Sequence, residues 1–364
     1  MKAQARSSAW SLRATNLGYA NMRACVFFEH GAANVLRIVD DLPIPEPGTG
    51  EVRVRMHAAA FNRLDIWVRA GWKGLNLHLP HITGSDGAGI VDALGDGVTA
   101  FQVGDRVCVD PTVVAADSPA LMTGLENQSR IAIMGEHVPG LAAEYRVLPT
   151  RNLLLVPEHI PFEGAAAAGL VYVTAWHSLI TRGKLQPGET VLLVGAGGGV
   201  NTASIQIAKL AGARVIVVGS SAEKCAKARE LGADTTIDRS EISDWGREVY
   251  RLTNKQGVDV VVDNVGKATM SDSIRSVRIG GRILVVGNTS GPIFELDLRY
   301  IFSKHISIIG STMGPHQDYV RVMNLVFDGA LKPVIGEVLP LADASRGIQM
   351  LEDGATFGKI VVTI

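Results

Sequence analysis

The sequence predicts an α/β protein with two parts, a β-rich domain and a doubly wound parallel sheet. Between residues 22 and 155, short stretches of alternating polar and apolar residues are separated by Gly, Pro and Asp, which is typical of half-buried strands. From residue 156, helical runs alternate with short strands rich in Val and Ile, as in parallel sheets buried between helices. The 364 residues suffice for two separate cores.

The β-rich part begins at Met22, where the run Arg-Ala-Cys-Val predicts a first strand. Residues 51–56 alternate between polar and apolar, and the Pro- and Gly-rich stretch 43–50 predicts the loop before them. We expect residues 316–364 to return to this domain and complete it. Further strands are expected at residues 89–93, 106–110 and 144–148.

The second part, residues 156–315, carries the alternation of strands and helices. Ile242, Trp245, Val249 and Leu252 are spaced at i, i+3, i+7 and i+10 and predict one apolar face of a helix. Repeated strand–helix–strand units predict a doubly wound sheet. The expected strands are residues 190–194, 214–218, 258–262, 282–286 and 307–309.

The composition excludes several classes of protein. A net charge of −1 gives no basic excess for nucleic acid or an anionic membrane. The three cysteines, Cys25, Cys108 and Cys225, are far apart and favour a reducing compartment over a disulfide scaffold. No apolar run approaches the roughly 20 residues of a membrane span. We therefore expect a cytoplasmic protein with a small-molecule partner, without nucleic-acid or membrane partners.

Residues 1–21 differ from the rest of the chain. They are rich in Ser and Ala, and Lys2, Arg6 and Arg13 all precede the first acidic residue, Glu29. This composition resembles that of an organelle-targeting peptide, whereas an N-terminal extension or an upstream start codon explains it equally. We expect an extension outside the fold, with organelle targeting as the alternative.

A glycine-rich turn in the second part predicts a dinucleotide site. The strand at 191–194 runs into residues 195–201, GAGGGVN, and a helix follows with Ala203 and Ile207 on one face. Such a turn lets the backbone approach a pyrophosphate, which the helix N-terminus stabilises. Asn201 stands where the pattern has a third Gly, so we expect the helix to lie slightly further from the strand. The candidate ligands are Gly197, Gly198, Gly199 and Val200.

The end of the next strand predicts which nicotinamide cofactor is bound. An acidic residue there would bind the ribose 2′-hydroxyl of NAD, but this chain has Gly219. The hydroxyl and ammonium groups that follow suit a 2′-phosphate, which predicts NADPH (NADP) rather than NADH. An alternative is that Ser220 caps the next helix and Lys224 lies on the solvated surface. The candidates are Gly219, Ser220, Ser221, Lys224 and, further along the chain, Arg239.

From about Met22 to the C-terminus the chain resembles the medium-chain dehydrogenase/reductase superfamily, near its quinone oxidoreductase and zinc-type alcohol dehydrogenase branches. The resemblance implies a GroES-like catalytic domain, a Rossmann domain, an active site in the cleft between them, and a homodimer or homotetramer. The matching motifs are residues 50–54 (GEVRV), 61–65 (FNRLD), 84–89 (GSDGAG), 103–107 (VGDRV), 196–200 (AGGGV) and 358–361 (GKIV).

The positions of the family's zinc ligands carry other residues here. The Cys, His and Cys that hold the catalytic zinc correspond to Asn62, Ser85 and Leu170. None of these side chains is a thiolate or an imidazole, the ligands that zinc prefers. The four cysteines of the structural zinc lobe correspond to Ala115, Ser118, Leu121 and Ser129. We therefore expect no metal.

Without a Lewis acid, hydride transfer to a quinone or an activated C=C bond is easier than alcohol oxidation, because the acceptor delocalises the charge. By resemblance Asn62 faces the nicotinamide, although a turn-stabilising Asn is the alternative. Trp67 stands where quinone reductases often carry a Tyr. Its ring either stacks on a flat acceptor or only packs against neighbouring side chains. Tyr172 is the nearest replacement acid by sequence, with a core Tyr or solvent as alternatives.

The remaining cofactor candidates come from strand ends and from the resemblance. Thr174 lies on the helix that lines the cleft in relatives, and its hydroxyl either contacts the nicotinamide half or bonds its own backbone. Lys359 lies near the cleft in relatives, or else on the surface. Strand ends form the ligand crevice of an open parallel sheet. The candidates there are Asn264, Val265, Gly287 and Asn288.

The leading hypothesis is thus a zinc-independent, NADPH-dependent reductase of quinones or α,β-unsaturated carbonyls. A zinc-type alcohol dehydrogenase acting on alcohols or aldehydes is one alternative. A non-catalytic NADPH-binding protein is the other, because Trp67 cannot deliver a proton at neutral pH.

Overall fold

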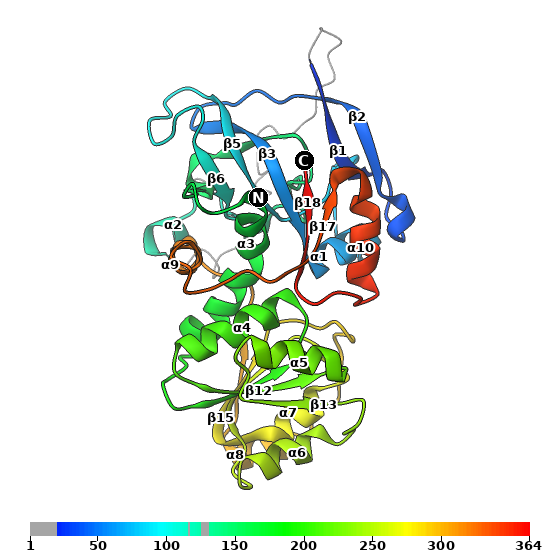
Figure 1. The fold of residues 1–364 in the computed structure, drawn as a ribbon, viewed down its shortest axis with the longest axis vertical. Coiled ribbons are helices and arrows are strands. Elements are labelled where there is room, and N and C mark those ends of the chain that lie inside the picture. Colours follow the sequence, from blue (N-terminus) through cyan, green and yellow to red (C-terminus); the bar gives the residue numbers. More distant parts are fainter. Residues whose placement is uncertain (1–19, 116, 125–130) are drawn as a thin grey trace, which may run out of the picture.

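The structure, a computed structural model, describes residues 20–115, 117–124 and 131–364. They form two domains along the long axis, with both chain ends contributing to the upper one in Figure 1. The first strand, β1 (Asn21–Phe27), includes the run after Met22 that predicted it. The expected extension, residues 1–21, lies almost wholly outside the described residues. Within the described ranges, no helix combines the length and apolarity that crossing a membrane requires.

The upper, GroES-like domain is built on a seven-stranded sheet. Its order is β10-β6-β5-β3-β18-β17, with β9 also paired to β3. A three-stranded sheet, β2-β1-β4, and a two-stranded one, β7-β8, complete it. The bounds are β2 (Arg37–Pro43), β3 (Glu51–Phe61), β4 (His81–Ile82), β5 (Asp86–Leu94), β6 (Arg106–Val109), β7 (Thr112–Val113), β8 (Ala132–Ile133), β9 (Tyr145–Pro149), β10 (Leu153–Leu155), β17 (Ile335–Pro340) and β18 (Lys359–Thr363).

The long strand β3 shows how burial changes along this sheet. In its first half, Val52, Val54 and Met56 are buried and alternate with more exposed polar residues, as the sequence predicts. Its last four residues, 58–61, are buried on both faces, between two hydrophobic cores. The strand therefore ends deep inside the molecule, and the residue that follows it, Asn62, is buried there too.

The lower, Rossmann domain has a six-stranded sheet in the order β13-β12-β11-β14-β15-β16, with every pairing parallel. Alternate residues face two cores, which confirms the predicted doubly wound arrangement. Leu193 and Val217 pack with α4 (Gly199–Leu210) on one side, and Leu192 and Ile216 pack with α6 (Trp245–Leu252) and α7 (Met270–Ser276) on the other. The bounds are β11 (Thr190–Val194), β12 (Arg214–Gly219), β13 (Thr235–Asp238), β14 (Val258–Asp263), β15 (Val277–Val285) and β16 (Ser307–Gly310).

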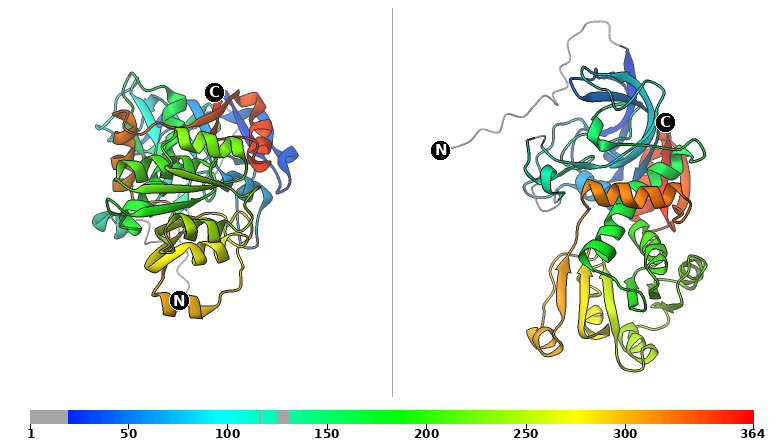
Figure 2. Two further views of the ribbon diagram at one scale, coloured as in Figure 1. Left: turned by 60° about the horizontal axis from the view of Figure 1, so that its bottom comes forward. Right: turned by 90° about the vertical axis from the view of Figure 1, so that its left-hand side faces the viewer.

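One helix, α3, joins the two domains. It is apolar on every side, packs against strands of the GroES-like sheet and against α4 and α9, and belongs to a core with residues from both domains. The side view in Figure 2 shows it passing between them, with α9 lying across. The helices are α1 (Arg63–Ala70), α2 (Ala120–Thr123), α3 (Phe162–Trp176), α4 (Gly199–Leu210), α5 (Ala222–Glu230), α6 (Trp245–Leu252), α7 (Met270–Ser276), α8 (Leu298–Lys304), α9 (His316–Phe327) and α10 (Ala344–Glu352).

Two local features differ from the sequence analysis. Strand β13 was not predicted, because its four residues, Thr-Thr-Ile-Asp, bury only Ile237 fully and lack an apolar run. The helix predicted from Ile242 begins at Trp245, where the Asp244 side chain accepts a hydrogen bond from the Arg247 backbone N–H and caps it. Ile242 therefore precedes α6 and is exposed.

Candidate active site

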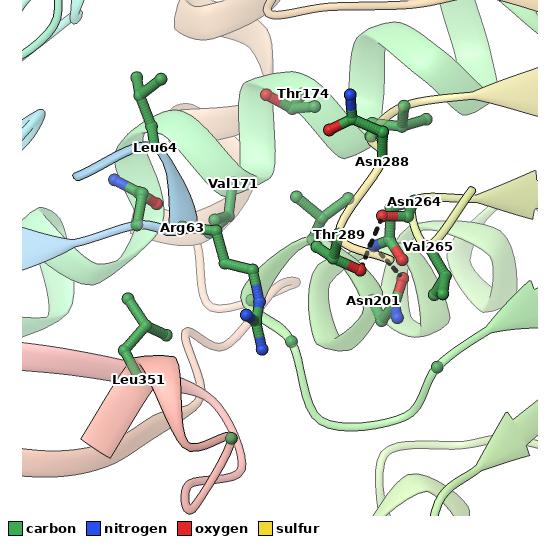
Figure 3. A pocket seen from close by; sticks show the side chains of 18 of the residues that line it. Arg63, Leu64, Val171, Thr174, Asn201, Asn264, Val265, Asn288, Thr289 and Leu351 are labelled. Atoms are coloured by element: carbon green, nitrogen blue, oxygen red, sulfur yellow. Dashed lines mark hydrogen bonds between the residues drawn. The ribbon is translucent and has the colours of Figure 1, made fainter. Parts of the chain in front are cut away.

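A cavity of about 940 Å³ lies between the two domains. It is lined by α1 and β18 from the GroES-like domain, by α3, and by the glycine-rich turn and strand ends of the Rossmann sheet. Figure 3 shows Arg63 extending into it from the α1 side, with Thr174 and Asn288 further along. Four lining side chains are cationic: Arg63, Lys224, Arg239 and Lys359. Among the described lining residues, Glu136 is the one carboxylate, so the pocket favours an anionic ligand.

The glycine-rich turn has the geometry of a pyrophosphate cradle. Gly195 has a φ of +104°, and Gly198 is the N-cap of α4. A Cβ at Gly199 would come within 2.9 Å of both Lys359 Cδ and Val171 Cγ1, so only glycine fits. A Cβ at Gly198 would meet no atom within 4 Å, because this position faces open space. The backbone and the N–H groups of the helix N-terminus are thus accessible to an anion.

Asn201, which replaces the third Gly of the pattern, is buried in this structure. Its Nδ2 donates to the Val194 carbonyl over 3.1 Å, and its Oδ1 accepts from Asn264 Nδ2 over 2.9 Å (Figure 3). A Cβ at Gly195 would lie 2.5 Å from Asn201 Nδ2. Asn201 therefore ties the start of α4 to the ends of β11 and β14, a role that the sequence pattern does not show.

The residues around the end of β12 include the candidates that the sequence analysis assigned to a 2′-phosphate. At Gly219 a Cβ would lie 2.5 Å from Cys225 Sγ, so a larger side chain has no room there. The exposed Arg239 lines the pocket beside it, and its backbone N–H donates to the Gly219 carbonyl. Ser220 and Lys224 also line the pocket, although Lys224 Nζ donates to the Gly354 carbonyl over 2.7 Å.

The expected helix cap lies one residue later than the sequence analysis placed it. Ser221, rather than Ser220, is the N-cap of α5, and its hydroxyl accepts from the Lys224 backbone N–H over 3.3 Å. Neither Ser221 nor Gly219 lines the pocket, whereas Ser220 does. Of the residues predicted to contact the 2′-phosphate, Ser220, Lys224 and Arg239 therefore have side chains at the pocket.

Asn62, Asp86 and Lys359 form a buried cluster at the inner end of the pocket, which we call the amide–ammonium cluster. Lys359 Nζ donates to Asn62 Oδ1 over 2.5 Å and pairs with Asp86 Oδ2 at 2.8 Å. Asn62 Nδ2 donates to the same Asp86 oxygen over 2.8 Å. The Leu170 backbone N–H donates to Asp86 Oδ1, and a Cβ at Gly169 would lie 2.3 Å from that oxygen.

This cluster fixes the orientation of the Asn62 amide. Its oxygen must face the ammonium, so its nitrogen faces Asp86, and a second N–H on Nδ2 has no partner among the described residues. Asn62 and Lys359 both line the pocket. Asn62 is therefore a candidate hydrogen-bond donor at the pocket.

Asp65 holds the segment that carries Asn62. Its carboxylate accepts from the backbone N–H groups of Asn62 and Gly84 over 2.7 and 2.8 Å, and from Thr83 Oγ1. Burial raises the pKa of Asp65 to about 6, although these hydrogen bonds and Lys359 act in the opposite direction. Asp65 thus joins the start of α1 to the strand that leads into Asp86.

The other two catalytic candidates lie in different places. Trp67, on α1, lines the pocket and is partly exposed. Tyr172 does not line it: its buried hydroxyl donates to the Lys332 carbonyl over 2.8 Å and accepts from Gln206. Burial also raises the pKa of Tyr172, so it is a poor acid. The prediction of Tyr172 as an active-site acid is therefore wrong, because α3 turns this side chain away from the cavity.

The remaining cofactor candidates line the pocket. Thr174 is buried, and its hydroxyl has only a long, 4.0 Å contact to Met313 Sδ. Lys359 lies in the amide–ammonium cluster rather than on the surface. The strand-end residues at the pocket are Asn264, Val265, Gly287 and Asn288.

Sequence reasoning missed three functional candidates. Asp86 and Arg63 stand within the motifs GSDGAG and FNRLD but were not singled out, and Glu136 lies in a loop without a motif. Arg63 had one signal, since it follows Asn62 at the start of a helix. Glu136 had none, because only the folded loop brings it to the pocket.

The positions of the family's zinc ligands come together, but with other chemistry. Ser85 is fully buried, and its Oγ has no hydrogen-bond partner among the described residues. Asn62 belongs to the cluster described above, and Leu170 contributes only its backbone N–H there. The parts of the chain that the structure covers contain no group of three His, Cys, Asp or Glu able to hold a metal ion. Ser129, in the predicted structural lobe, lies outside the described residues.

Comparisons with known proteins agree with this architecture. The model of the alcohol dehydrogenase GroES-like domain matches residues 48–158, and that of the zinc-binding dehydrogenase family matches residues 199–328. Quinone oxidoreductase of Rattus norvegicus is 30% identical, over 95% of this chain and 99% of its own. An acryloyl-coenzyme A reductase of Metallosphaera sedula is 31% identical, over 94% of this chain and 100% of its own.

A solved structure of an NAD-dependent alcohol dehydrogenase is 44% identical, with a TM-score of 0.91, and the match covers 94% of this chain and 100% of that one. These matches cover 94–95% of this chain, so they extend over both domains. The chain is therefore an NAD(P)H-dependent oxidoreductase and belongs to the medium-chain dehydrogenase/reductase superfamily.

Proposed function

We propose that the protein is a zinc-independent reductase that uses NADPH to reduce a quinone or an α,β-unsaturated carbonyl compound. The observation that carries this proposal is the amide–ammonium cluster. Where zinc relatives place thiolates and an imidazole, this chain has Asn62, Ser85 and Leu170, and the ammonium of Lys359 is paired there with Asp86. An amide, a hydroxyl and an alkyl group do not form a zinc site.

The chain's own groups account for charge stabilisation during the reaction. Bound NADPH supplies the hydride. As the hydride reaches the acceptor, negative charge develops on the acceptor's carbonyl oxygen, and the free N–H of Asn62 donates to it. Lys359 and Asp86 hold this amide in one orientation, so no reorganisation is needed. Lys359 also adds a positive charge in a buried, low-dielectric setting.

The acceptor end of the pocket suits a flat, apolar molecule. Leu64, Trp67, Ile133 and Met313 give the pocket apolar walls, and we assign Trp67 as an aromatic face for stacking on the acceptor. Quinones and conjugated carbonyl compounds are planar. This fit supports reduction of such acceptors rather than of small, flexible alcohols.

The cofactor is held by residues of both domains in this proposal. The turn at Gly197–Gly199 and the guanidinium of Arg63 contact the pyrophosphate, and the strand ends at Asn264 and Asn288 line the path to the nicotinamide. Thr174 offers its hydroxyl to the nicotinamide half. We assign the 2′-phosphate to Arg239 and Ser220, because Lys224 is already engaged by Gly354.

Arg239→Ala is expected to raise the KM for NADPH roughly 10- to 100-fold and to leave the KM for NADH unchanged. A charge-assisted hydrogen bond contributes about 1.5–3 kcal/mol, and only NADPH carries the phosphate that receives it. Steady-state kinetics with both cofactors measure the effect. Arg214→Ala, at the exposed far end of β12, is the matched control. An equal rise for both cofactors would show that Arg239 does not read the 2′-phosphate.

A second candidate function is NAD-dependent alcohol oxidation. The 44% identical structure is that of an NAD-dependent alcohol dehydrogenase, which favours this candidate. The donor set at Asn62, Ser85 and Leu170 opposes it, because alkoxide stabilisation in such enzymes relies on a Lewis acid. The two candidates differ in the direction of turnover, the preferred cofactor and the metal content.

Purified protein should be assayed with NADPH against a panel of quinones and enones, and with NAD against a panel of primary and secondary alcohols. We expect NADPH absorbance to fall with at least one quinone or enone. Turnover confined to alcohols would favour the second candidate, and lack of turnover with every quinone and enone would contradict the proposal.

We also propose that the chain forms a homodimer through the β16 edge of the Rossmann sheet. This edge is unpaired, and apolar side chains beside it are exposed, with Ile308 on β16 and Phe302 on α8 at 42% and 67%. Exposed apolar groups at an open sheet edge favour pairing with a second copy. Size-exclusion chromatography with light scattering should give a mass of two chains for the wild type and a mass of one chain for Ile308→Lys. A monomeric wild-type protein would refute the interface, and a tetramer would require a further one.

A further inference from the structure

We infer that Glu136 is the general acid that delivers the proton to the reduced acceptor, an inference that rests on the proposed reductase function. Hydride transfer alone leaves an anion, so reduction of a C=C bond needs one proton as well. Trp67 and Tyr172 do not supply it: an indole is no acid at neutral pH, and the hydroxyl of Tyr172 is outside the pocket. Glu136 is the one carboxyl group among the described residues that line the cavity.

The loop that carries Glu136 packs against the amide–ammonium end of the pocket. Gly135 has a φ of +79°, and a Cβ there would lie 2.9 Å from the Gly84 carbonyl and 3.0 Å from Ser85 Oγ. Ser85 immediately precedes Asp86, the carboxylate that holds Asn62. Glu136 is therefore at the same end of the cavity as the N–H that we assign to the acceptor's carbonyl oxygen, not at the 2′-phosphate end.

The backbone of this loop is fixed by its own hydrogen bonds. The N–H groups of Glu136 and His137 both donate to the Ile133 carbonyl, over 3.0 and 2.9 Å, and the Gly135 N–H donates to the Val138 carbonyl over 2.9 Å. Ile133 also lines the pocket. A rigid loop places the carboxyl group reproducibly, which a proton donor requires.

The surroundings of Glu136 favour its protonated form. The side chain is only 13% exposed, and this burial raises the pKa of Glu136. Its nearest titratable neighbour is His137, whose Nδ1 lies 3.7 Å from Oε2. The Ile133 backbone N–H donates to this same nitrogen over 3.3 Å, which holds the His137 ring beside the carboxyl group. The electrostatic interaction with His137 lowers the pKa of Glu136, but burial has the larger effect and raises it.

The other charged groups around the cavity do not pair with Glu136. Within the described part of the chain, no hydrogen bond or ion pair joins Glu136 to another residue that lines the cavity. The cationic residues that line it are Arg63 on α1, Lys359 on β18, Lys224 on α5 and Arg239 after β13. A carboxyl group whose pKa is raised and which lines an active-site cavity is suited to general acid catalysis.

The proposed step balances as follows. The hydride forms a C–H bond at the β-carbon of the enone, and the π electrons move to give an enolate, whose oxygen accepts from Asn62. The enolate then takes the proton of Glu136 at its α-carbon, which leaves a carboxylate. Solvent returns a proton to Glu136 through the loop surface, where His137 is exposed. The net change is reduction of one C=C bond and oxidation of one NADPH.

Glu136→Gln tests this step, because the amide keeps the shape and has no acidic proton. With an enone that carries one α-substituent, we expect kcat to fall about 100-fold, in line with general acid catalysis, while the Kd for NADPH is unchanged. The wild-type kcat/KM should fall as pH rises through the pKa of Glu136, and this decline should be absent in the variant. The wild-type product should have one configuration at the α-carbon, and the variant product should be a mixture.

Two further variants complete the experiment. Glu136→Asp should restore part of the activity and the single configuration, and Glu230→Gln, on the exposed end of α5, should behave as wild type. An active wild type together with an unimpaired, stereospecific Glu136→Gln variant would overturn the assignment of Glu136 and leave the reductase function standing. A wild type that reduces no acceptor would overturn the proposed function and this inference with it.

Discussion

Replacing Asn62 with Ala is expected to lower kcat with an enone or a quinone about 100- to 1,000-fold, the usual cost of losing one preorganised donor to a developing oxyanion. The variant removes the side-chain amide that Asp86 and Lys359 hold in one orientation and that we assign to the acceptor. Because this contact strengthens as charge develops, kcat and kcat/KM should fall together. Steady-state kinetics with a saturating and a limiting acceptor measure both.

The control for this prediction is Asn324→Ala, an exposed position on α9. It should leave kcat unchanged. NADPH affinity, measured by fluorescence titration, should also be unchanged in Asn62→Ala, because Asn62 contacts the acceptor in this proposal and not the phosphates. If Asn62→Ala keeps wild-type kcat, Asn62 is a structural residue of the turn.

Lys359→Met is expected to destabilise the protein by about 3–5 kcal/mol, because it leaves the carboxylate of Asp86 buried without its cation. The side chains of Lys359 and Asp86 are 4% and 0% exposed. Methionine keeps most of the length and apolar packing of the lysine stem, so the loss reports chiefly on the charge. Urea unfolding at neutral pH, followed by circular dichroism, measures the free energy of unfolding.

Two comparisons make this prediction specific. Lys209→Met removes a surface pair with Asp234, both 37% exposed, and should cost less than about 1 kcal/mol. The double variant Asp86→Asn/Lys359→Met should recover much of the stability of Lys359→Met, since no unpaired charge remains, but its kcat should stay low. A single variant as stable as wild type would show that the pair is not a buried charge pair in solution.

The fold was predictable from the sequence where apolar patterns are strong. Parallel strands such as β11 and β12 bury both faces, so continuous Val and Ile runs identify them. Strand β13 was missed because Ile237 is its one apolar residue. The strand is stabilised by its backbone pairing with β12, which the sequence pattern does not show. The start of α6 was misplaced because the cap at Asp244, rather than the periodicity, decides it. The domain borders that we propose, after residues 155 and 315, stay predictions.

The candidate site was predictable only in part, for a physical reason. The glycine-rich turn is local, so sequence alone indicates it, and Asn62 was indicated by the family motif. Lys359 and Asp86 are 273 residues apart in the sequence. Only the folded chain shows that their side chains are paired beside Asn62 and are not exposed to solvent. Tyr172 was proposed as the nearest replacement acid by sequence, but its position on α3 directs its hydroxyl to the Lys332 carbonyl instead of the pocket.

We propose that Asn62, oriented by Lys359 and Asp86, performs the role for which zinc-type alcohol dehydrogenases use their metal. The most direct test measures the zinc content of purified, active enzyme by mass spectrometry and then its turnover of an enone with NADPH after prolonged treatment with a chelator. The account predicts far less than one zinc per chain and undiminished turnover. One zinc per chain, with activity that is lost on chelation and returns with zinc, would contradict it.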